Sequence, residues 1–240
     1  AIGGGRATAD GGLVLMASIW NPVESQYTPA QRVMIWHPAR ESKILNFPDT
    51  DILDVALLDT NTLIVVGRGS TFWWDLAQEK VVHTEKGTGH LSENGKSIAF
   101  FESSSTFNRV IGPARFFRTN RAGKITKLDS VHSCGFSPNG DKFGCAIPRG
   151  KSNEYFRRVF SVDDGDLLNE VSLNGNWVMA RLSPDGDADL DGGEHTTHHT
   201  IWTANSNSHL VGGESDFALG FSYSGRLIMV EGDYLKLSEY

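Results

Sequence analysis

The sequence has few of the features that mark membrane, disulfide-rich or nucleic-acid-binding proteins. Two cysteines among 240 residues are too few for a disulfide framework. No apolar run reaches the roughly 18–20 residues that a membrane helix needs. There are 22 basic and 29 acidic residues, so the formal net charge is −7, whereas proteins held to nucleic acid by its phosphates are usually basic. No Asn-x-Ser/Thr glycosylation acceptor is present. We therefore expect a cytoplasmic globular protein that binds no membrane.

Helical periodicity is also missing. Apolar residues gather instead in short runs, such as residues 62–66 (Thr-Leu-Ile-Val-Val) and 97–101 (Ser-Ile-Ala-Phe-Phe). Runs of this length, rich in β-branched and aromatic residues, are typical of buried strands. The sequence therefore predicts an all-β fold.

A polar turn containing glycine recurs between these runs. Proline, Asn or Asp, and then Gly supply the backbone angles that a tight hairpin requires. Residues 58–61 (Leu-Asp-Thr-Asn) form a degenerate copy of the turn. The other copies are Ala9-Asp10-Gly11-Gly12, Leu91-Ser92-Glu93-Asn94-Gly95, Phe136-Ser137-Pro138-Asn139-Gly140, Leu182-Ser183-Pro184-Asp185-Gly186 and Phe221-Ser222-Tyr223-Ser224-Gly225.

Aromatic anchors set the period of the repeat. They stand 38, 43, 43 and 42 residues apart, and each of the first four is followed by a polar stretch and another short strand, at residues 43–47, 80–84, 124–128 and 167–173. The five anchors are Trp36, Trp74, Phe117, Phe160 and Trp202. Each repeat therefore holds about four short strands. One such sheet cannot bury both of its faces, so neighbouring repeats must stack.

Repeats of this length, with four strands, a Ser-Pro-Asp-Gly-like turn and a later aromatic residue, resemble the blade of WD40-like β-propellers. Residues 72–82 and 136–146 carry the resemblance best. The pattern departs from the family because only Trp74 is followed by Asp, and the Gly-His pair occurs once, as Gly89-His90. The resemblance implies a single propeller domain over residues 1–240, with about six four-stranded blades.

Strand counting leaves this propeller about one strand short. After Gly225 only two strands fit, over residues 226–231 and 234–240. An open apolar edge promotes aggregation. Either residues 1–8 close the ring, or the chain is part of a larger propeller or multidomain chain, which the sequence favours.

The segment from Asp185 to His199 is the richest in potential metal ligands. Asp187, Asp189 and Asp191 match the start of a calcium loop, but His198 stands where an EF-hand places its bidentate Glu. Glu194, His195 and His198 could bind zinc, but their spacing does not fix the geometry of a zinc site. We interpret the segment as the second strand of a blade with an acidic loop, and predict no metal, cofactor or catalytic residue.

Three other features have simpler structural interpretations. Arg115-Phe116-Phe117-Arg118 with Lys124 and Lys127 offers rings and cations to nucleic acid, but Phe117 is expected in the core, so we consider nucleic-acid binding unlikely. Ser137 and Ser222 fail to complete Gly-x-Ser-x-Gly and belong to the turn. Gly3-Gly4-Gly5 is expected to be a flexible end. Cys134 and Cys145 flank the Asn139-Gly140 turn symmetrically, which predicts facing, buried, reduced thiols.

WD40-like domains typically act as scaffolds, and the leading hypothesis is therefore a non-catalytic module that binds partner proteins through its loops. Trp20, Tyr27 and Tyr155 stand in loop-like stretches and are candidates for the rim. The alternative is an enzyme: a metal-dependent propeller hydrolase or lactonase, or the gating propeller of a serine peptidase. The sequence favours the non-catalytic hypothesis because no reactive centre is evident in it.

Overall fold

The protein is made of antiparallel β-strands and turns. The structure, a computed structural model of the whole chain, describes residues 2–8, 10–18, 20–21, 26–27, 29–102, 112–149, 154–174, 181–191, 199–203, 208–211, 216–222, 224, 226–231 and 234–238. Within these ranges there is no helix, and so none that could cross a membrane. The prediction of an all-β fold is confirmed. The chain forms two compact units, Ala1–Gly95 and Lys96–Tyr240, and this division does not test whether residues 1–240 are one domain.

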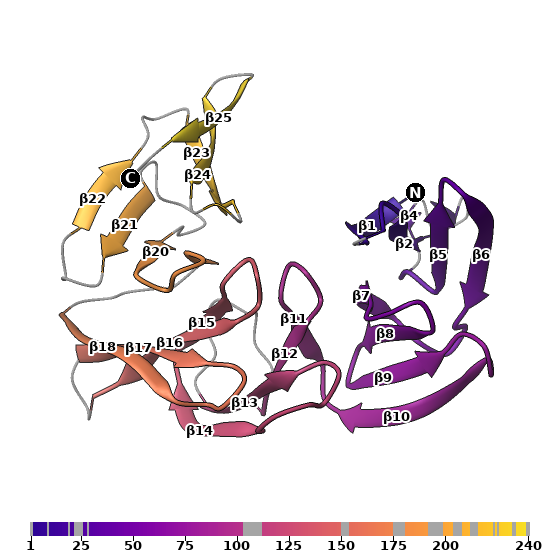
Figure 1. Cartoon of the computed structure of the whole chain (residues 1–240), viewed down its shortest axis with the longest axis horizontal. Coiled ribbons are helices and arrows are strands. Elements are labelled where there is room, and N and C mark those ends of the chain that lie inside the picture. Colours follow the sequence, from indigo (N-terminus) through magenta and orange to yellow (C-terminus); the bar gives the residue numbers. More distant parts are fainter. Residues whose placement is uncertain are drawn as a thin grey trace. The chain divides into compact units, whose positions relative to one another are not determined.

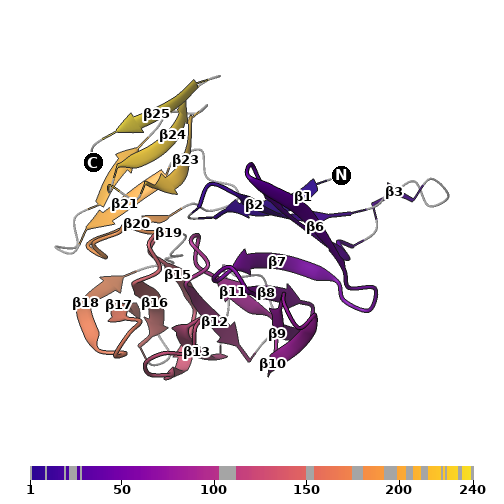
Figure 2. The ribbon, with the colours of Figure 1, turned by 45° about the vertical axis from the view of Figure 1, so that its right-hand side comes forward.

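The first unit contains two four-stranded sheets, with the strand orders β1-β2-β5-β6 and β10-β9-β8-β7. In Figures 1 and 2 the strands of the second sheet lie side by side in sequence order. A separate two-stranded sheet is formed by β3 and β4, and the short strand β11 follows the second sheet. The strands are β1 (Ile2–Ala7), β2 (Leu13–Ala17), β3 (Trp20–Asn21), β4 (Gln26–Tyr27), β5 (Arg32–His37), β6 (Arg40–Asn46), β7 (Ile52–Leu57), β8 (Thr62–Gly67), β9 (Ser70–Asp75), β10 (Lys80–Lys86) and β11 (Gly89–Leu91).

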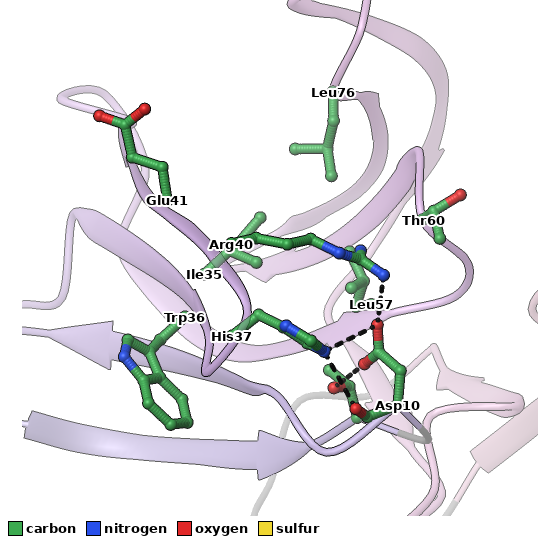
Figure 3. A pocket seen from close by; sticks show the side chains of 10 residues that line it. Asp10, Ile35, Trp36, His37, Arg40, Glu41, Leu57, Thr60 and Leu76 are labelled. Atoms are coloured by element: carbon green, nitrogen blue, oxygen red, sulfur yellow. Dashed lines mark hydrogen bonds and ion pairs between the residues drawn. The ribbon is translucent and has the colours of Figure 1, made fainter.

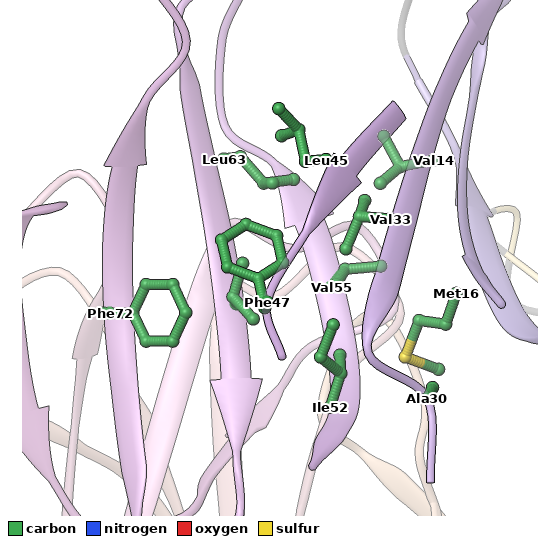
Figure 4. Close-up of a cluster of buried hydrophobic side chains, with 11 residues drawn as sticks. Val14, Met16, Ala30, Val33, Leu45, Phe47, Ile52, Val55, Leu63 and Phe72 are labelled. Atoms are coloured by element: carbon green, nitrogen blue, oxygen red, sulfur yellow. The ribbon is translucent and has the colours of Figure 1, made fainter. Parts of the chain in front are cut away.

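The core of the first unit joins these two four-stranded sheets (Figure 4). Successive strand residues point to opposite faces, so Val14 and Met16 are buried while Leu13 stays partly exposed. The ring of Phe47, which follows β6 of the first sheet, packs against two rings on β9 of the second sheet. Its centroid lies 5.5 Å from that of Phe72 and 5.2 Å from that of Trp74. Each fully buried aliphatic side chain of this kind contributes about 1.5–3 kcal/mol to folding.

The remaining sheets repeat the same plan. Their orders are β11-β12-β13-β14, β15-β16-β17-β18, β19-β20-β21-β22 and, with three described strands, β23-β24-β25. A second core, with Phe116, Phe143 and Phe160 at its centre, lies in the second unit. The strands are β12 (Ser97–Phe101), β13 (Gly112–Arg118), β14 (Thr126–Val131), β15 (Ser133–Phe136), β16 (Lys142–Pro148), β17 (Glu154–Ser161), β18 (Leu167–Asn174), β19 (Arg181–Leu182), β20 (Ala188–Asp191), β21 (His199–Thr203), β22 (Ser208–Val211), β23 (Asp216–Phe221), β24 (Leu227–Glu231) and β25 (Tyr234–Ser238).

The predicted repeat is confirmed in its strand positions. The five aromatic anchors lie on β5, β9, β13, β17 and β21, which are the third strands of their sheets. The short strands expected after the anchors are the fourth strands β6, β10, β14 and β18. The last sheet has two described strands after its turn, as the strand count required.

The structure excludes one alternative for the N-terminal end, the closure of the ring by residues 1–8 that the sequence favoured less, and shows that the expectation for Gly3-Gly4-Gly5 is wrong. Residues 2–7 form β1 and pair with β2 in the first sheet, so they do not supply a missing strand to the last one. Gly3-Gly4-Gly5 lies within this strand and is not a flexible end. A Cβ atom on Gly5 would lie 2.6 Å from the backbone oxygen of Val14, so the close contact between β1 and β2 requires glycine there. Whether the chain belongs to a larger propeller stays a prediction.

The recurrent turn has one hydrogen-bond pattern. A hydroxyl donates to the side-chain oxygen two residues later, and the glycine N–H donates back to the carbonyl of the hydroxyl residue. The glycines adopt φ values near +70 to +84°, which favour residues without a Cβ. In the degenerate copy, Asp59 Oδ1 accepts the N–H groups of Asn61 and Thr62 instead. The turns that follow the hydroxyl pattern begin at Thr8, Ser92, Ser137 and Ser183.

Basic side chains link these turns to neighbouring sheets within each unit. In the first unit Arg6 Nη1 donates to the carbonyl of Ser92 at 2.6 Å. In the second unit Arg118 Nη1 donates to Gly140 O at 3.1 Å, Lys142 Nζ to Pro184 O at 3.0 Å and Arg157 Nη2 to Gly186 O at 2.8 Å. These bonds satisfy turn carbonyls at the boundaries between sheets, where unpaired polar groups would be costly.

The side chains of Trp74 and Asp75, the one Trp-Asp pair of the repeat, do not bond to each other. Asp75 Oδ1 accepts the N–H groups of Ala77 and Gln78 and so closes its own hairpin turn. The backbone bond from Gln78 is the largest cause that lowers the pKa of Asp75. The buried Nε1 of Trp74 has no acceptor among the described residues.

Candidate functional site

Four hairpin turns of the first unit surround a small pocket (Figure 3). The turn between β1 and β2 supplies Thr8 and Asp10, and the turn between β5 and β6 supplies His37 and Arg40. The pocket has a volume of about 70 Å³. Sites that enclose a small-molecule ligand usually have about 300–1,000 Å³. Its full lining is Thr8, Asp10, Ile35, Trp36, His37, Arg40, Glu41, Leu57, Thr60 and Leu76.

The floor of the pocket is apolar. Ile35, Leu57 and Leu76 are partly buried and pack against the core of the first unit, so their accessible surfaces continue that core outward. Lys43 on β6 binds the turn between β9 and β10, which contains Leu76. Its Nζ donates to Leu76 O at 3.0 Å and pairs with Glu79 at 2.8 Å. The last turn of the pocket is therefore tied to the first sheet.

The rim is organised by the carboxylate of Asp10. Thr8 Oγ1 donates to Asp10 Oδ1, and Arg40 Nη2 lies 3.3 Å from Asp10 Oδ2. In Figure 3 the side chain of Arg40 extends across the pocket toward this oxygen. The hydrogen bond from Thr8 is the largest cause that lowers the pKa of Asp10, and the charge of Arg40 acts in the same direction, while burial opposes them. The rim therefore carries a charged, hydrogen-bonded carboxylate.

The tautomer of His37 follows from its two partners. The N–H of Ala39 donates to His37 Nδ1 at 3.1 Å, so this ring nitrogen is an acceptor. The other nitrogen, Nε2, therefore carries the proton and donates to the carbonyl of Asp10 at 3.0 Å. His37 thus fixes the position of the Asp10 turn against the β5–β6 turn.

Trp36 was expected to anchor the core, and this expectation is wrong. Its side chain is 39% exposed, and Leu13, its register partner on β2, is 37% exposed. Val33 and Ile35 occupy the core-facing positions of β5, so alternation directs Trp36 to the opposite face. Figure 3 shows its indole directed away from Asp10. Trp74, Phe117 and Phe160 do contribute to packed cores, whereas the side chain of Trp202 lies outside the described residues.

The sequence did not single out this pocket. Asp10 had been identified only as a turn residue, and His37 only as the residue after an aromatic anchor. The available signal was that Asp10 and Thr60 stand in predicted turns, while Arg40 stands in the polar stretch after Trp36.

The histidine-rich half of the acidic and histidine-rich segment lies largely outside the described residues. Residues 192–198, with Glu194, His195 and His198, are among them. Residues 188–191 form β20, the second strand of its sheet, as the structural interpretation predicted. Asp185 is a turn residue whose pKa burial would raise, but bonds from Ser183 and the N–H of Asp187 lower it. In the part of the chain that is described, no three His, Cys, Asp or Glu side chains cluster as metal ligands would.

The basic and aromatic stretch on β13 has its rings in the interior. Phe116 and Phe117 are at most 2% exposed, so they present no face on which a base could stack. Arg118 is bound to Asp141 and Asp163. Phe116 and Phe117 therefore offer no exposed ring on which a nucleic-acid base could stack.

Other candidates have structural roles or lie elsewhere than expected. Ser137 and Ser222 use their hydroxyls within their own turns. Tyr155 lies on β17, half-buried beside His132, with 5.0 Å between ring centroids. Trp20 and Tyr27 pair with each other on β3 and β4, and their side chains lie outside the described residues. All three rim candidates are therefore in strands, not loops.

Comparison with known proteins shows the fold alone. No protein-family model and no curated protein matches the sequence. The structure of Hsv2 from Kluyveromyces lactis, a WD40-type β-propeller, matches with a TM-score of 0.54 at 13% identity, covering 99% of this chain and 98% of that one. A second Hsv2 structure from this yeast, with its loop 6CD complete, gives 0.52 at 12% identity with the same coverage. Hydrazine synthase from Kuenenia stuttgartiensis gives 0.47 at 13% identity over 94% of this chain and 72% of that one, which is too low to support an argument. The fold class is therefore a β-propeller of four-stranded sheets.

Proposed function

We propose that this chain is a non-catalytic protein-binding module, a divergent WD40-type propeller that captures one apolar side chain of a partner protein in the pocket of its first unit. The observation that carries the proposal is the combination of an apolar floor with a charged rim at the hairpin end of the sheets. Protein interfaces share this anatomy, with an apolar centre enclosed by polar groups.

The size and position of the pocket support this proposal over a cofactor or substrate site. A volume of about 70 Å³ suits the end of a single side chain. Four of the lining residues, Thr8, Asp10, Thr60 and Leu76, lie in turns, where sequence can vary without disturbing the sheets, and the other six lie near the ends of strands. Arg40, whose side chain is 58% exposed, can offer its remaining N–H groups to a partner while staying near Asp10.

Peptide selection tests the proposal without a known partner. A displayed library of random peptides is panned against the full chain, and selected peptides are measured by fluorescence anisotropy against three proteins. Thr60→Trp places a bulky ring at the mouth of the pocket, and Asn61→Trp places the same ring one exposed position away. We expect peptides with an apolar anchor, bound equally by the wild type and Asn61→Trp and at least about tenfold more weakly by Thr60→Trp.

Equal binding to Thr60→Trp and the wild type would place the contact elsewhere and refute the pocket. Hydrolysis of lactone or ester substrates by the full chain, dependent on added calcium or zinc, would favour the metal-dependent enzyme instead. Circular dichroism of both tryptophan variants controls for folding, since both positions are exposed.

A further inference from the structure

Cys134 and Cys145 face each other directly on neighbouring strands. Cys134 on β15 is the register partner of Cys145 on β16. The hairpin closes with a bond from Ser137 N to Lys142 O at 3.1 Å. Hydrogen-bonded and non-hydrogen-bonded pairs alternate along an antiparallel ladder, so the bonded pairs are 137/142 and 135/144, and 134/145 is non-bonded. The predicted facing of the two thiols is confirmed.

A non-hydrogen-bonded pair has the geometry that a cross-strand disulfide needs. Its Cα atoms are typically about 4.5 Å apart, and its side chains are closer than those of a bonded pair. Disulfides join Cα atoms about 4.4–6.8 Å apart. The two side chains interact, since Cys134 is one of the causes that raise the pKa of Cys145.

The thiols are protected while the hairpin is closed. Both cysteines are 0% exposed and are free, and they pack with Phe116, Phe143 and Phe160. Burial is the largest cause that raises the pKa of Cys145, and the hydrogen bond with Cys134 adds to it. Because a thiolate is the reactive form, Cys145 reacts slowly in the closed state, and burial keeps an oxidant away from both sulfur atoms.

The position of β15 gives an oxidant a route to the pair. β15 has four residues and is the first strand in its sheet order, so it is bonded to β16 alone in that sheet. The pair next to the cysteines is Gly135 opposite Gly144, which adds no side-chain packing across the two strands. Local opening of one hairpin requires less free energy than unfolding of the whole domain.

We propose that Cys134 and Cys145 are an oxidation site that forms an internal disulfide when β15 opens in the presence of a two-electron oxidant such as hydrogen peroxide. The thiolate of one cysteine attacks a peroxide oxygen and becomes a sulfenic acid, and the O–O bond breaks to release hydroxide, which takes up a proton as water. The second thiol attacks that sulfur and displaces a second water. Two thiols and one peroxide thus give one disulfide and two waters, and the disulfide joins β15 to β16.

The test uses the full chain, reduced and then exposed to hydrogen peroxide. After quenching, the protein is unfolded in guanidinium with N-ethylmaleimide, and intact mass is measured. We expect loss of both labels, a mass about 2 Da below that of the reduced chain, a peptide linking Cys134 to Cys145, and recovery of both labels after dithiothreitol. The rate should rise in low denaturant, because opening of the hairpin limits it.

Cys134→Ala and Cys145→Ala provide the matched controls. Each keeps one thiol, so each should form sulfenic acid or dimers but no internal link. If either variant fails to fold, non-reducing electrophoresis of the oxidised wild type still separates an internal disulfide from a dimer. Full labelling of both cysteines after oxidation, or dimers alone, would refute the proposal, and neither outcome bears on the proposed binding pocket.

Discussion

The guanidinium of Arg118 binds both carboxylate oxygens of Asp163, with 2.6 Å from Nε to Oδ1 and 2.9 Å from Nη2 to Oδ2. Arg118 ends β13, and Asp163 follows β17 in the next sheet of the second unit. The same guanidinium also contacts Asp141 and the carbonyl of Gly140. One side chain therefore connects two sheets at their turns, at the position after the aromatic anchor where the WD40 pattern has Asp.

We predict that Arg118→Met destabilises the second unit, and that Asp163→Asn adds little once Arg118 is gone. Asp163 is 66% exposed, so the coupling in a double-mutant cycle should be about 1 kcal/mol. Urea denaturation of the four proteins measures it. Lys127→Met, on the exposed part of β14, is the control and should leave stability nearly unchanged. Fully additive losses from Arg118 and Asp163 would contradict the role given to this pair.

The same pair predicts an acid dependence. The hydrogen bond from Arg118 is the largest cause that lowers the pKa of Asp163 below its ordinary value. A carboxyl with a depressed folded pKa contributes stability above its unfolded pKa and loses it as pH falls through the folded value. We expect the stability lost by the wild type below about pH 4 to be smaller in Arg118→Met. Identical pH profiles would show that the pair does not contribute.

His90 predicts a second and separate pH effect, in the first unit. Burial lowers its pKa from 6.5 to about 4, and the charge of Asp54 opposes this only partly. The unfolded chain therefore binds a proton at His90 near pH 6.5, whereas the folded chain does not. The free energy of unfolding therefore falls as the pH decreases from about 6.5 toward 4. The loss should reach at most about 3 kcal/mol. His90→Asn should flatten this range, and NMR titration of His90 should give a midpoint well below 6.5. A midpoint near 6.5 would contradict the prediction.

Two turn glycines form a matched pair for testing backbone strain against contact. Gly11 and Gly95 have φ values of +84° and +71°. A Cβ on Gly11 would meet nothing within 4 Å, whereas one on Gly95 would lie 2.5 Å from the Cβ of Ala56. We expect Gly11→Ala to lower the free energy of unfolding by about 1–2 kcal/mol, because alanine is strained in the left-handed backbone. Gly95→Ala should lower it by about 1–3 kcal/mol more, because of the clash with Ala56. Thermal unfolding of both variants measures the difference, and equal losses would contradict it.

The sequence by itself determined the strands and hairpins, because these depend on residues that are close together in the chain. Alternating apolar residues specify strands, and the Asn-Gly and Asp-Gly turns at Asn139 and Asp185 specify hairpins whatever the rest of the chain does. The facing of Cys134 and Cys145 also follows from one turn and one register. These features could be counted along the chain, so the repeat and its four-stranded sheets were predictable.

Only the tertiary structure decided which surface of each strand is covered and which turns meet. Trp36 has the same sequence context as the other anchors, yet it lies on the exposed face of β5 because the core of the first unit covers the side of Val33 and Ile35. The pocket gathers Asp10, Leu57 and Leu76 from turns far apart in sequence, and only the packing of two sheets brings them together. Periodicity within one strand carries no information about which sheet packs against it, so the pocket could not be predicted from the sequence.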